Sequence, residues 1–295
     1  MKIDKNSKIR RKKDKRESKY DTFSLTMQLE EPILTEEDIK REKEENKNRK
    51  RKKVNGKLKK IAVVVIALII VATSVWILNS YKPLEYAQQS MESDENVNVV
   101  NGNIIEFNPT GEKSDTGIII YPELKVEAAS YAPLARKIAE EGYSVYITDM
   151  PLNVPLLSPN RANNIIENEK DIENWVIAAH SFGGIAATKV AENNPKINGI
   201  VYMSSYTTSG TIKKKDKKVL SIWGSKDGII DFESMIKARE NFPDDTEYLE
   251  IEGGNHSQFG DYGQQKDDEK AVISLEEQLK VTAEGIVSFI ENKIK

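Results

Sequence analysis

An apolar run near the N-terminus constrains this chain more than any other feature. Residues 61–78, IAVVVIALIIVATSVWIL, carry no charge, and only Thr73 and Ser74 among them are polar. An α-helix rises about 1.5 Å per residue, so this run forms a helix about 27 Å long, which matches the hydrocarbon core of a bilayer. A buried core helix would show polar interruptions, and a cleavable signal peptide does not follow a long basic segment. We therefore predict a transmembrane helix over residues 61–79.

The charges beside the apolar run predict its orientation. Nine Lys and Arg residues lie between positions 47 and 60, whereas Lys82 is the single basic residue near the opposite end. Basic flanks stay on the cytoplasmic side, so we expect a cytoplasmic N-terminus and an extracytoplasmic domain from about residue 80 onward. Anionic lipid headgroups account for the basic cluster at 47–60. We expect no nucleic-acid binding, because no aromatic residues are interleaved with these charges.

Charge also separates an N-terminal arm from the rest of the chain. Residues 1–60 hold 22 Lys and Arg against 12 Asp and Glu, a net charge of +10, whereas residues 61–295 hold 22 against 35, a net charge of −13. Such an arm buries too little apolar surface to fold, so we expect disorder, with a transient helix around residues 35–53 that Thr35 caps. Residues 80–96 are expected to form a polar linker. The chain has no cysteine, which excludes disulfides, thiolate zinc sites and a cysteine nucleophile.

Residues 97–295 show the alternation that is typical of an α/β domain. A hairpin with Asn101 and Gly102 at its turn comes first. Apolar strands are then expected at 117–122, 144–149, 174–181, 197–205, 217–224 and 246–253, and helices at 127–141, from 161, and at 183–193, 232–241 and 274–293. This order predicts a mostly parallel sheet flanked by helices, with reactive groups at the carboxyl ends of the strands.

The segment AHSFGG (179–184) lies between a predicted strand and a predicted helix. It matches the small-x-Ser-x-Gly turn that lifts a nucleophilic serine above the sheet edge, with Ala179 in place of the first glycine. We therefore predict Ser181 as a nucleophile and the backbone N–H of Phe182 as an oxyanion donor. An ordinary tight turn built from small residues is the alternative.

A serine nucleophile needs a base, and the chain has two histidines. His180 is the immediate neighbour of Ser181 and should point to the other side of the turn. His256 lies in the glycine-rich segment GGNHSQFGDYG, just after the last predicted strand. Elimination therefore makes His256 the predicted base, with a surface-loop histidine of no function as the alternative.

The acid that orients the base should follow another strand end. Asp227 comes directly after the predicted strand 217–224, and the resulting chain order of Ser, Asp and His is the one found in α/β-hydrolases. Asp231 is the nearest competitor, but it fits better as the N-cap of the helix that begins at Phe232. We therefore predict Asp227 as the acid.

The loop YPELKV (121–126) should supply a second oxyanion donor. Pro122 has no N–H, so Glu123 is the first available donor and Leu124 the next.

Two other patterns are not expected to be functional. GEKS (111–114) lacks the glycine spacing of a phosphate-binding loop. The acidic residues 267–269 are expected to form a solvated turn. Two histidines with scattered carboxylates predict no metal site, and we expect no cofactor.

Four segments resemble the bacterial α/β-hydrolase fold-5 family, whose relatives include dienelactone hydrolase-like enzymes. They are IIIYPELKVEAASYAPLARKIAEEGYSVYITDMPLNVPLL (118–157), AAHSFGG (178–184), WGSKDGII (223–230) and GGNHSQFGDYG (253–263). The resemblance implies a Ser181–Asp227–His256 triad with an oxyanion hole near Glu123 and Phe182.

The chain departs from this family in one place. The loop after the first parallel strand usually carries glycines where this chain has Glu123 and Leu124. Dienelactone hydrolase itself uses a cysteine nucleophile, so its substrate is not carried over.

Together these features predict a membrane-anchored, extracytoplasmic serine hydrolase of the carboxylesterase type. Residues 206–216 are too few for a large lid, so we expect an open cleft and a small-molecule or exposed acyl-ester substrate. The rival prediction is a catalytically inactive hydrolase fold that serves as a membrane-tethered binding or assembly module. The long charged arm and the non-glycine residues of the loop 121–126 favour this rival.

Overall fold

The structure is a computed structural model, and it describes residues 35–295. The predicted disorder of residues 1–34 therefore lies outside the described residues. A boundary after Ile69 separates two compact units.

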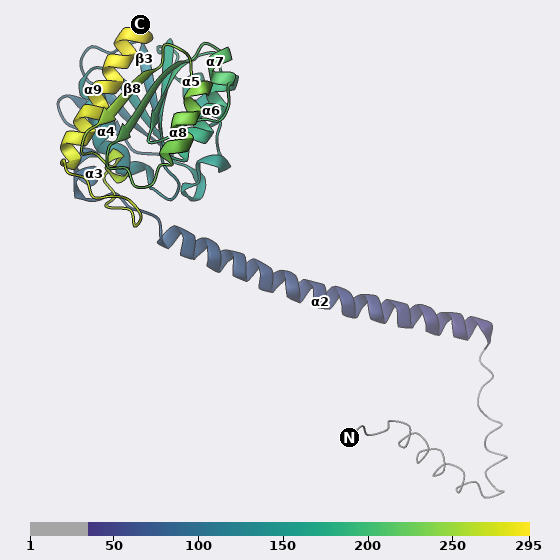
Figure 1. Ribbon diagram of the computed structural model, residues 1–295. Helices are drawn as coiled ribbons and strands as arrows, with labels where there is room; N and C mark the ends of the chain where they lie inside the picture. Colours follow the sequence, from purple (N-terminus) through teal and green to yellow (C-terminus); the bar gives the residue numbers. More distant parts are fainter. Residues whose placement is uncertain (1–34) are drawn as a thin grey trace, which may run out of the picture. The chain divides into compact units, whose positions relative to one another are not determined.

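A single long helix, α2 (Glu36–Leu78), contains the predicted transmembrane segment (Figure 1). The Asp38 N–H donates to Thr35 Oγ1 (3.2 Å), and the Thr35 N–H donates to the Asp38 carboxylate (3.1 Å), which caps the first turn. Within the described residues, α2 is the one helix that is long and apolar enough to cross a membrane. Residues 36–60 are helical rather than disordered, because a capped start and a helical apolar run allow the helix to propagate between them.

The expected polar linker at 80–96 is instead part of the folded domain. It contains helix α3 (Glu85–Ser90), in which Ala87 is buried. The Asp261 side chain accepts from the N–H of Ala87 (2.9 Å), and the Asp261 carbonyl accepts from the N–H of Leu84 (3.0 Å). A distant loop thus satisfies the free N–H groups at the start of this helix, and no local sequence pattern indicates that pairing.

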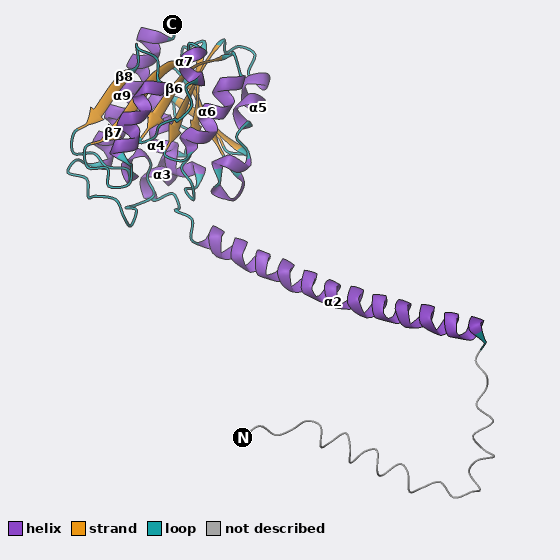
Figure 2. Cartoon of the chain, turned by 45° about the vertical axis from the view of Figure 1, so that its right-hand side comes forward, coloured by secondary structure: helices purple, strands orange, loops and turns teal. Residues whose placement is uncertain are grey.

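The domain is built on an eight-stranded sheet in the order β1-β2-β4-β3-β5-β6-β7-β8 (Figures 1 and 2). Its strands are β1 (Val97–Val100), β2 (Ile104–Pro109), β3 (Thr116–Tyr121), β4 (Ser144–Thr148), β5 (Asn174–His180), β6 (Ile197–Met203), β7 (Lys218–Gly224) and β8 (Glu247–Ile251). The hairpin β1–β2 is antiparallel and joins antiparallel to β4, whereas β3 to β8 are parallel. The mostly parallel sheet is confirmed, and the edge where its parallel strands end is called the carboxyl edge below.

Helices cover both faces of the sheet and bury two apolar cores (Figure 2). Helices α4 (Ala132–Glu140) and α9 (Leu275–Lys293) pack on one face, and α5 (Arg161–Asn168), α6 (Gly183–Asn193) and α7 (Thr211–Lys214) pack on the other. Helix α8 (Phe232–Ala238) follows β7. Because both faces are covered, the central strands are apolar along their length, as in the WVIAA of β5.

Short helical turns account for most differences from the predicted elements. The predicted helix 127–141 divides into the 3₁₀ turn η2 (Ala128–Tyr131) and α4. Two further 3₁₀ turns, η3 (Pro151–Asn153) and η4 (Pro155–Leu157), shape the loop after β4. Each begins with a proline, whose fixed φ suits the first position of a helical turn.

Candidate active site

The turn after β5 has the geometry of a nucleophile elbow. Ser181 has a φ of 50°, in the left-handed region that costs energy for residues other than glycine. Its N–H donates to the carbonyl of Met203 at the end of β6 (3.0 Å). A Cβ at Gly183 would lie 2.6 Å from the carbonyl oxygens of Tyr121 and Pro122, so α6 can begin this close to β3 only with glycine there. These constraints are those of a turn that raises a serine hydroxyl above the carboxyl edge.

The two predicted oxyanion donors differ in their partners. The N–H of Phe182, at the start of α6, donates to no acceptor within the described part of the chain. The N–H of Glu123 donates to the Tyr131 hydroxyl (3.0 Å) and is therefore not free in this conformation. An oxyanion could bind at Glu123 only after Tyr131 releases this N–H, whereas Phe182 needs no such change.

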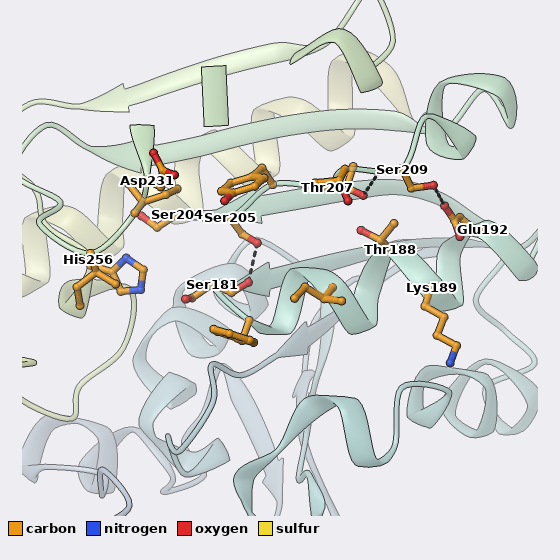
Figure 3. Close-up of a pocket in the computed structure, with 16 residues that line it drawn as sticks. Ser181, Thr188, Lys189, Glu192, Ser204, Ser205, Thr207, Ser209, Asp231 and His256 are labelled. Carbon is orange, nitrogen blue, oxygen red and sulfur yellow. Dashed lines mark hydrogen bonds between the residues drawn. The ribbon is translucent and has the colours of Figure 1, made fainter. Parts of the chain in front are cut away.

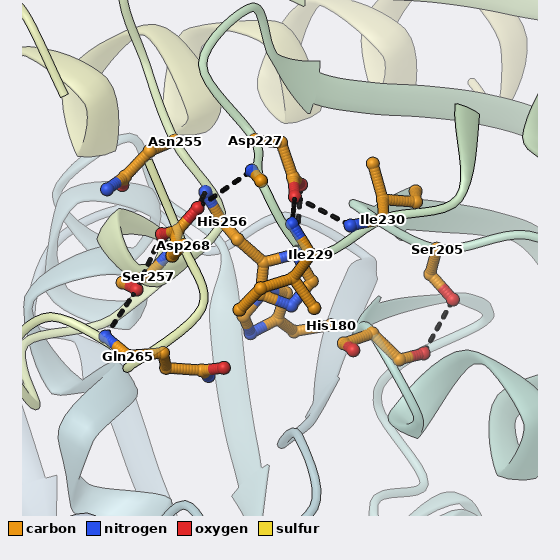
Figure 4. A network of polar contacts seen from close by, with 12 residues as sticks. His180, Ser205, Asp227, Ile229, Ile230, Asn255, His256, Ser257, Gln265 and Asp268 are labelled. Atoms are coloured by element: carbon orange, nitrogen blue, oxygen red, sulfur yellow. Dashed lines mark hydrogen bonds and ion pairs between the residues drawn. The ribbon is translucent and has the colours of Figure 1, made fainter. Parts of the chain in front are cut away.

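His256 and Asp227 form a buried hydrogen-bonded pair next to this turn (Figure 4). His256 Nδ1 lies 2.9 Å from Asp227 Oδ2. The other oxygen, Asp227 Oδ1, accepts from the N–H groups of Ile229 (2.9 Å) and Ile230 (2.8 Å). The backbone thus fixes the carboxylate, and the carboxylate fixes the imidazole with Nδ1 as donor and Nε2 as the group left for chemistry.

The competing carboxylate, Asp231, has the structural role that its sequence context predicts. Its side chain accepts from the N–H of Ser234 (3.2 Å) and from the Ser234 hydroxyl (2.6 Å) at the start of α8. It therefore acts as a helix cap, and Asp227 is the carboxylate that contacts the imidazole.

Asp268 links the loops that carry Asp227 and His256 (Figure 4). Its carboxylate accepts from the N–H groups of His256 (3.3 Å) and Ser257 (2.8 Å), from the Ser257 hydroxyl (2.6 Å) and from the N–H of Gly228 (3.0 Å), the residue after Asp227. The expected solvated turn at 267–269 is therefore corrected: one of its carboxylates is a tether between two functional loops. A run of acidic residues gives no local sign of such a contact.

Ser181 and His256 both line a cavity of about 600 Å³ at the carboxyl edge (Figure 3). Its lining is apolar at Phe182, Ile185, Ile229 and Ile230, bears hydroxyls at Thr188 and residues 204–209, and is charged at Lys189, Glu192 and Asp231. His256 Nε2 is buried without a hydrogen-bond partner within the described residues, so the serine and the imidazole are not yet bonded. Catalytic hydrogen bonds of this kind often tighten only when substrate binds.

The carboxylate of Glu123 has no counterpart among the predicted site groups, which included only its N–H. It is buried, and its Oε1 lies 3.5 Å from His256 Nε2. Its Oε2 accepts from Gln265 Nε2 (2.5 Å) and lies 3.4 Å from the Tyr262 hydroxyl. A polar niche thus holds a second carboxylate against the base. An acidic residue two positions after a buried strand is the sequence signal that points to it.

The two carboxylates control the charge of His256. Burial by itself would lower the pKa of His256, but its hydrogen bond to Asp227, the Glu123 oxygen 3.5 Å from its Nε2 and the charges of both carboxylates outweigh burial and raise the pKa to about 10. Burial would raise the pKa of both carboxyls, but the adjoining imidazole holds each pKa below its usual range. In this conformation the site therefore contains an imidazolium between two carboxylates.

His180 lies beside this group and remains neutral. Its side chain is fully buried, and its Nδ1 lies 2.8 Å from the Tyr131 hydroxyl. Burial lowers the pKa of His180 to about 3, although the Glu123 charge opposes that shift. The 3.6 Å contact between His180 Nδ1 and Glu123 is therefore no ion pair at neutral pH. The predicted separation of His180 from the nucleophile holds in one respect: Ser181 lines the cavity and His180 does not.

The sequence predicts no metal site, yet three residues that could ligate a metal ion lie close together. The fold brings a donor atom from each of Glu123, His180 and His256 within 4.8 Å of one another, all buried. The three residues come from the loop after β3, the end of β5 and the loop after β8, so their spacing along the chain gives no indication of the cluster. Three donors are the number that a catalytic zinc site uses, but one of them is the imidazole of His256, the predicted base.

Comparison with known proteins places the domain in a family. The model of the alpha/beta hydrolase family matches residues 117–280, more than half of the chain. No curated protein sequence matches the chain significantly.

Solved structures share the fold at low sequence identity. A membrane phospholipase A, a bacterial virulence factor, has a TM-score of 0.51 at 12% identity, over 83% of this chain and 99% of that one. The esterase domain of a Rhodothermus marinus protein has a TM-score of 0.50 at 10% identity, over 68% and 99%. TT1662 from Thermus thermophilus has 0.50 at 14% identity, over 66% and 99%. The likeness extends over nearly the whole of each of these structures, and the family match includes Ser181, Asp227 and His256. This chain belongs to the alpha/beta hydrolase family.

Proposed function

We propose that this protein is a membrane-anchored serine hydrolase that cleaves acyl esters, with Ser181 as nucleophile, His256 as base and Asp227 as acid. One observation carries the proposal. A serine held at a φ of 50° at a strand end shares one cavity with a buried imidazole, and a fixed carboxylate lies 2.9 Å from the far nitrogen of that imidazole. Strain and paired titratable groups of this kind gather at catalytic sites.

The proposed reaction is acyl transfer to water. Ser181 Oγ attacks the acyl carbon while its proton passes to His256 Nε2, and the N–H of Phe182 stabilises the oxyanion. The proton then passes to the departing alcohol, and water releases the acyl group by the same steps in reverse. One lost oxyanion donor costs about 10²–10³ in rate, so release of the Glu123 N–H from Tyr131 would raise the rate by a comparable factor.

His256 must first be neutral. A pKa of about 10 leaves about one imidazole in a thousand neutral at pH 7. Glu123 Oε1 lies 3.5 Å from Nε2, the atom that must face Ser181, so the carboxylate and the nucleophile compete for it. A substrate that moves Nε2 away from Glu123 lowers the pKa of His256 and activates the base.

The proposed location follows from charge. The basic residues between 47 and 60 lie against anionic headgroups on the cytoplasmic side, and the hydrolase domain lies outside. The chain has no cysteine, so a membrane-impermeant maleimide on intact cells should label a Lys196→Cys variant and leave the parent unlabelled. Labelling only after lysis would place the domain inside.

A fluorophosphonate probe tests the chemistry directly. The full chain in detergent or nanodiscs should be labelled covalently, and Ser181→Ala should abolish the label. Ser209→Ala is the matched control, because Ser209 lines the same cavity away from the base and bonds Glu192. A folded full chain that takes up no label at any pH up to about 10 contradicts the proposal.

That negative result would favour the second candidate, a catalytically inactive binding module tethered to the membrane. The Glu123 carboxylate supports it, because this group keeps His256 charged, and the adjoining N–H is bonded to Tyr131. Such a module would also show no gain of labelling in Glu123→Gln, in which the competing charge is removed.

A further inference from the structure

The chain joins the domain at the same edge that carries the nucleophile. The N–H of Tyr81 donates to the carbonyl of Lys125 (2.7 Å), and the N–H of Glu127 donates to the carbonyl of Tyr81 (3.0 Å). Tyr81 thereby forms a parallel bridge with Val126, in the loop after β3. Three residue steps separate Tyr81 from Leu78, the end of the apolar run, which allows a span of about 10 Å. The carboxyl edge is therefore held within a short reach of the membrane surface.

The last turn of α2 belongs to the same compact unit as the domain and contacts it directly. The indole N–H of Trp76 donates to the carbonyl of Leu152 in the loop after β4 (2.9 Å). The Lys125 ammonium lies 4.8 Å from the centroid of the Trp76 ring. Tryptophan is the residue that prefers the headgroup region at the end of a membrane helix. These contacts hold the loops after β3 and β4 near the lipid headgroup region that Trp76 prefers.

A series of exposed apolar side chains extends from Leu152, which Trp76 contacts, to the cavity that contains Ser181. We define the apolar rim as Leu152, Leu156, Leu157, Phe182 and Ile185, which are between 42% and 58% exposed. The turn η4, which carries two of the leucines, packs against α6, whose N-cap is Phe182 and whose first turn carries Ile185. Both of these last residues line the cavity that contains Ser181. Single exposed apolar residues are ordinary, but a group of five that leads from a membrane helix to a nucleophile is not.

Charge does not explain contact between this domain and a membrane. Residues 61–295 carry a net charge of −13, so an anionic leaflet would repel them. Burial of apolar side chains is the interaction that remains, and salt screens it little. The partner that fits the apolar rim is therefore the lipid layer itself.

We propose that the apolar rim lies in the leaflet from which the chain emerges at Leu78, and that Ser181 takes its acyl ester from a lipid of that leaflet. The placement depends on the contacts above, and the substrate class depends on the proposed function. The acyl chain lies along Phe182 and Ile185, and the polar headgroup occupies the hydroxyl-lined part of the cavity at 204–209. Ser181 Oγ bonds to the acyl carbon, the ester C–O bond breaks, and the alcohol leaves with the proton from Oγ. Water then yields the fatty acid and restores the serine.

The placement can be measured without any activity. A nitroxide on Leu157→Cys, in the full chain in phosphatidylcholine nanodiscs, should collide more with oxygen than with a water-soluble nickel complex. The control is Lys196→Cys, an exposed position just before β6 and so at the opposite edge of the sheet, which should show the reverse. The pattern should persist in high salt. Equal exposure of both labels to the nickel complex would overturn the placement.

The substrate class is tested with two esters and the same nanodiscs. Leu156→Ser/Leu157→Ser should lose about tenfold or more in hydrolysis of a fluorogenic diacyl lipid. It should hydrolyse p-nitrophenyl acetate at the parent rate, because neither leucine lines the cavity. Ile236→Ser, at a residue of similar exposure on α8, is the control and should hydrolyse both esters normally. A parent that cleaves the soluble ester but not the lipid overturns this inference alone. A parent that cleaves neither overturns the proposed function.

Discussion

The end of β5 and the loop after β8 each contribute a buried histidine, and the two rings lie with their centroids 4.7 Å apart. Burial lowers the pKa of His180 to about 3, whereas two carboxylates reverse the effect of burial at His256 and raise its pKa to about 10. His180 Nδ1 is occupied by the uncharged Tyr131 hydroxyl, and His256 Nδ1 by the charged Asp227. The two rings are equally buried, yet His180 is neutral and His256 is charged. The polar groups that face each ring therefore determine its charge state.

The largest expected effect separates the two rings by function. His256→Ala should lower kcat on a soluble ester by about 10⁴-fold or more, because it removes the base. His180→Asn should retain most of the parental rate, because His180 does not line the cavity and bonds Tyr131 instead. Steady-state kinetics in detergent measures both, with thermal melts to show that each variant is folded. If both folded variants lose kcat to the same extent, the proposal that His256 and not His180 acts as the base is wrong.

The next effect tests the carboxylate that distinguishes the two sites. Glu123→Gln keeps the backbone N–H but removes the charge 3.5 Å from His256 Nε2, so the pKa of the base should fall. In the plot of kcat/KM against pH, the ascending limb should therefore move to lower pH by about 1–3 units, and the rate at pH 7 should increase. Glu127→Gln, in the same loop, is the matched control and should not move it. An unchanged limb would show that Glu123 does not control the base.

The turn at Ser181 and the presence of His256 and Asp227 beside it could be predicted, because local pattern and elimination define them. AHSFGG marks the turn at Ser181, and a chain with two histidines leaves His256 once the neighbour of the serine is set aside. The position of Glu123 two residues after a strand marks its carboxylate as a candidate, but its contacts could not be found this way, since its partner Gln265 lies 142 residues away. The Asp261 bonds that fold residues 84–87 onto the domain are also long-range. Local periodicity reports which face is buried, but it does not report which polar groups meet there.

Stability should show the same contrast at opposite ends of the pH range. His180 has a folded pKa of about 3, below its ordinary value near 6.5, so the stability it provides is complete above pH 6.5 and is lost as pH falls toward 3. His256 has a folded pKa of about 10, so its contribution is complete below pH 6.5 and is lost as pH rises toward 10. One proton corresponds to about 1.4 kcal/mol per pH unit at most. The free energy of unfolding is measured by denaturant titration at a series of pH values. His180→Asn should reduce its dependence on pH on the acid side, and His256→Asn should reduce it on the alkaline side. If the slope of the free energy of unfolding against pH changes in neither variant, these charge states are wrong.

The smallest expected effect concerns the cluster that the two rings share with Glu123. In the proposed mechanism the nitrogen His256 Nε2 carries a proton and not a metal ion, so EDTA should leave kcat and KM unchanged in the parent. Each of the three residues also has a hydrogen-bond partner outside the cluster, Tyr131 for His180, Asp227 for His256 and Gln265 for Glu123, which holds the three side chains in place. Such support is also what a metal site requires, so added Zn²⁺ should inhibit by occupying Nε2. Glu123→Gln should weaken that inhibition because it removes one anionic ligand. Loss of activity in EDTA with recovery in Zn²⁺ would instead identify this cluster as a metal centre. His256 would then be a metal ligand and not an imidazolium, so the contrast between a neutral His180 and a charged His256 would no longer hold.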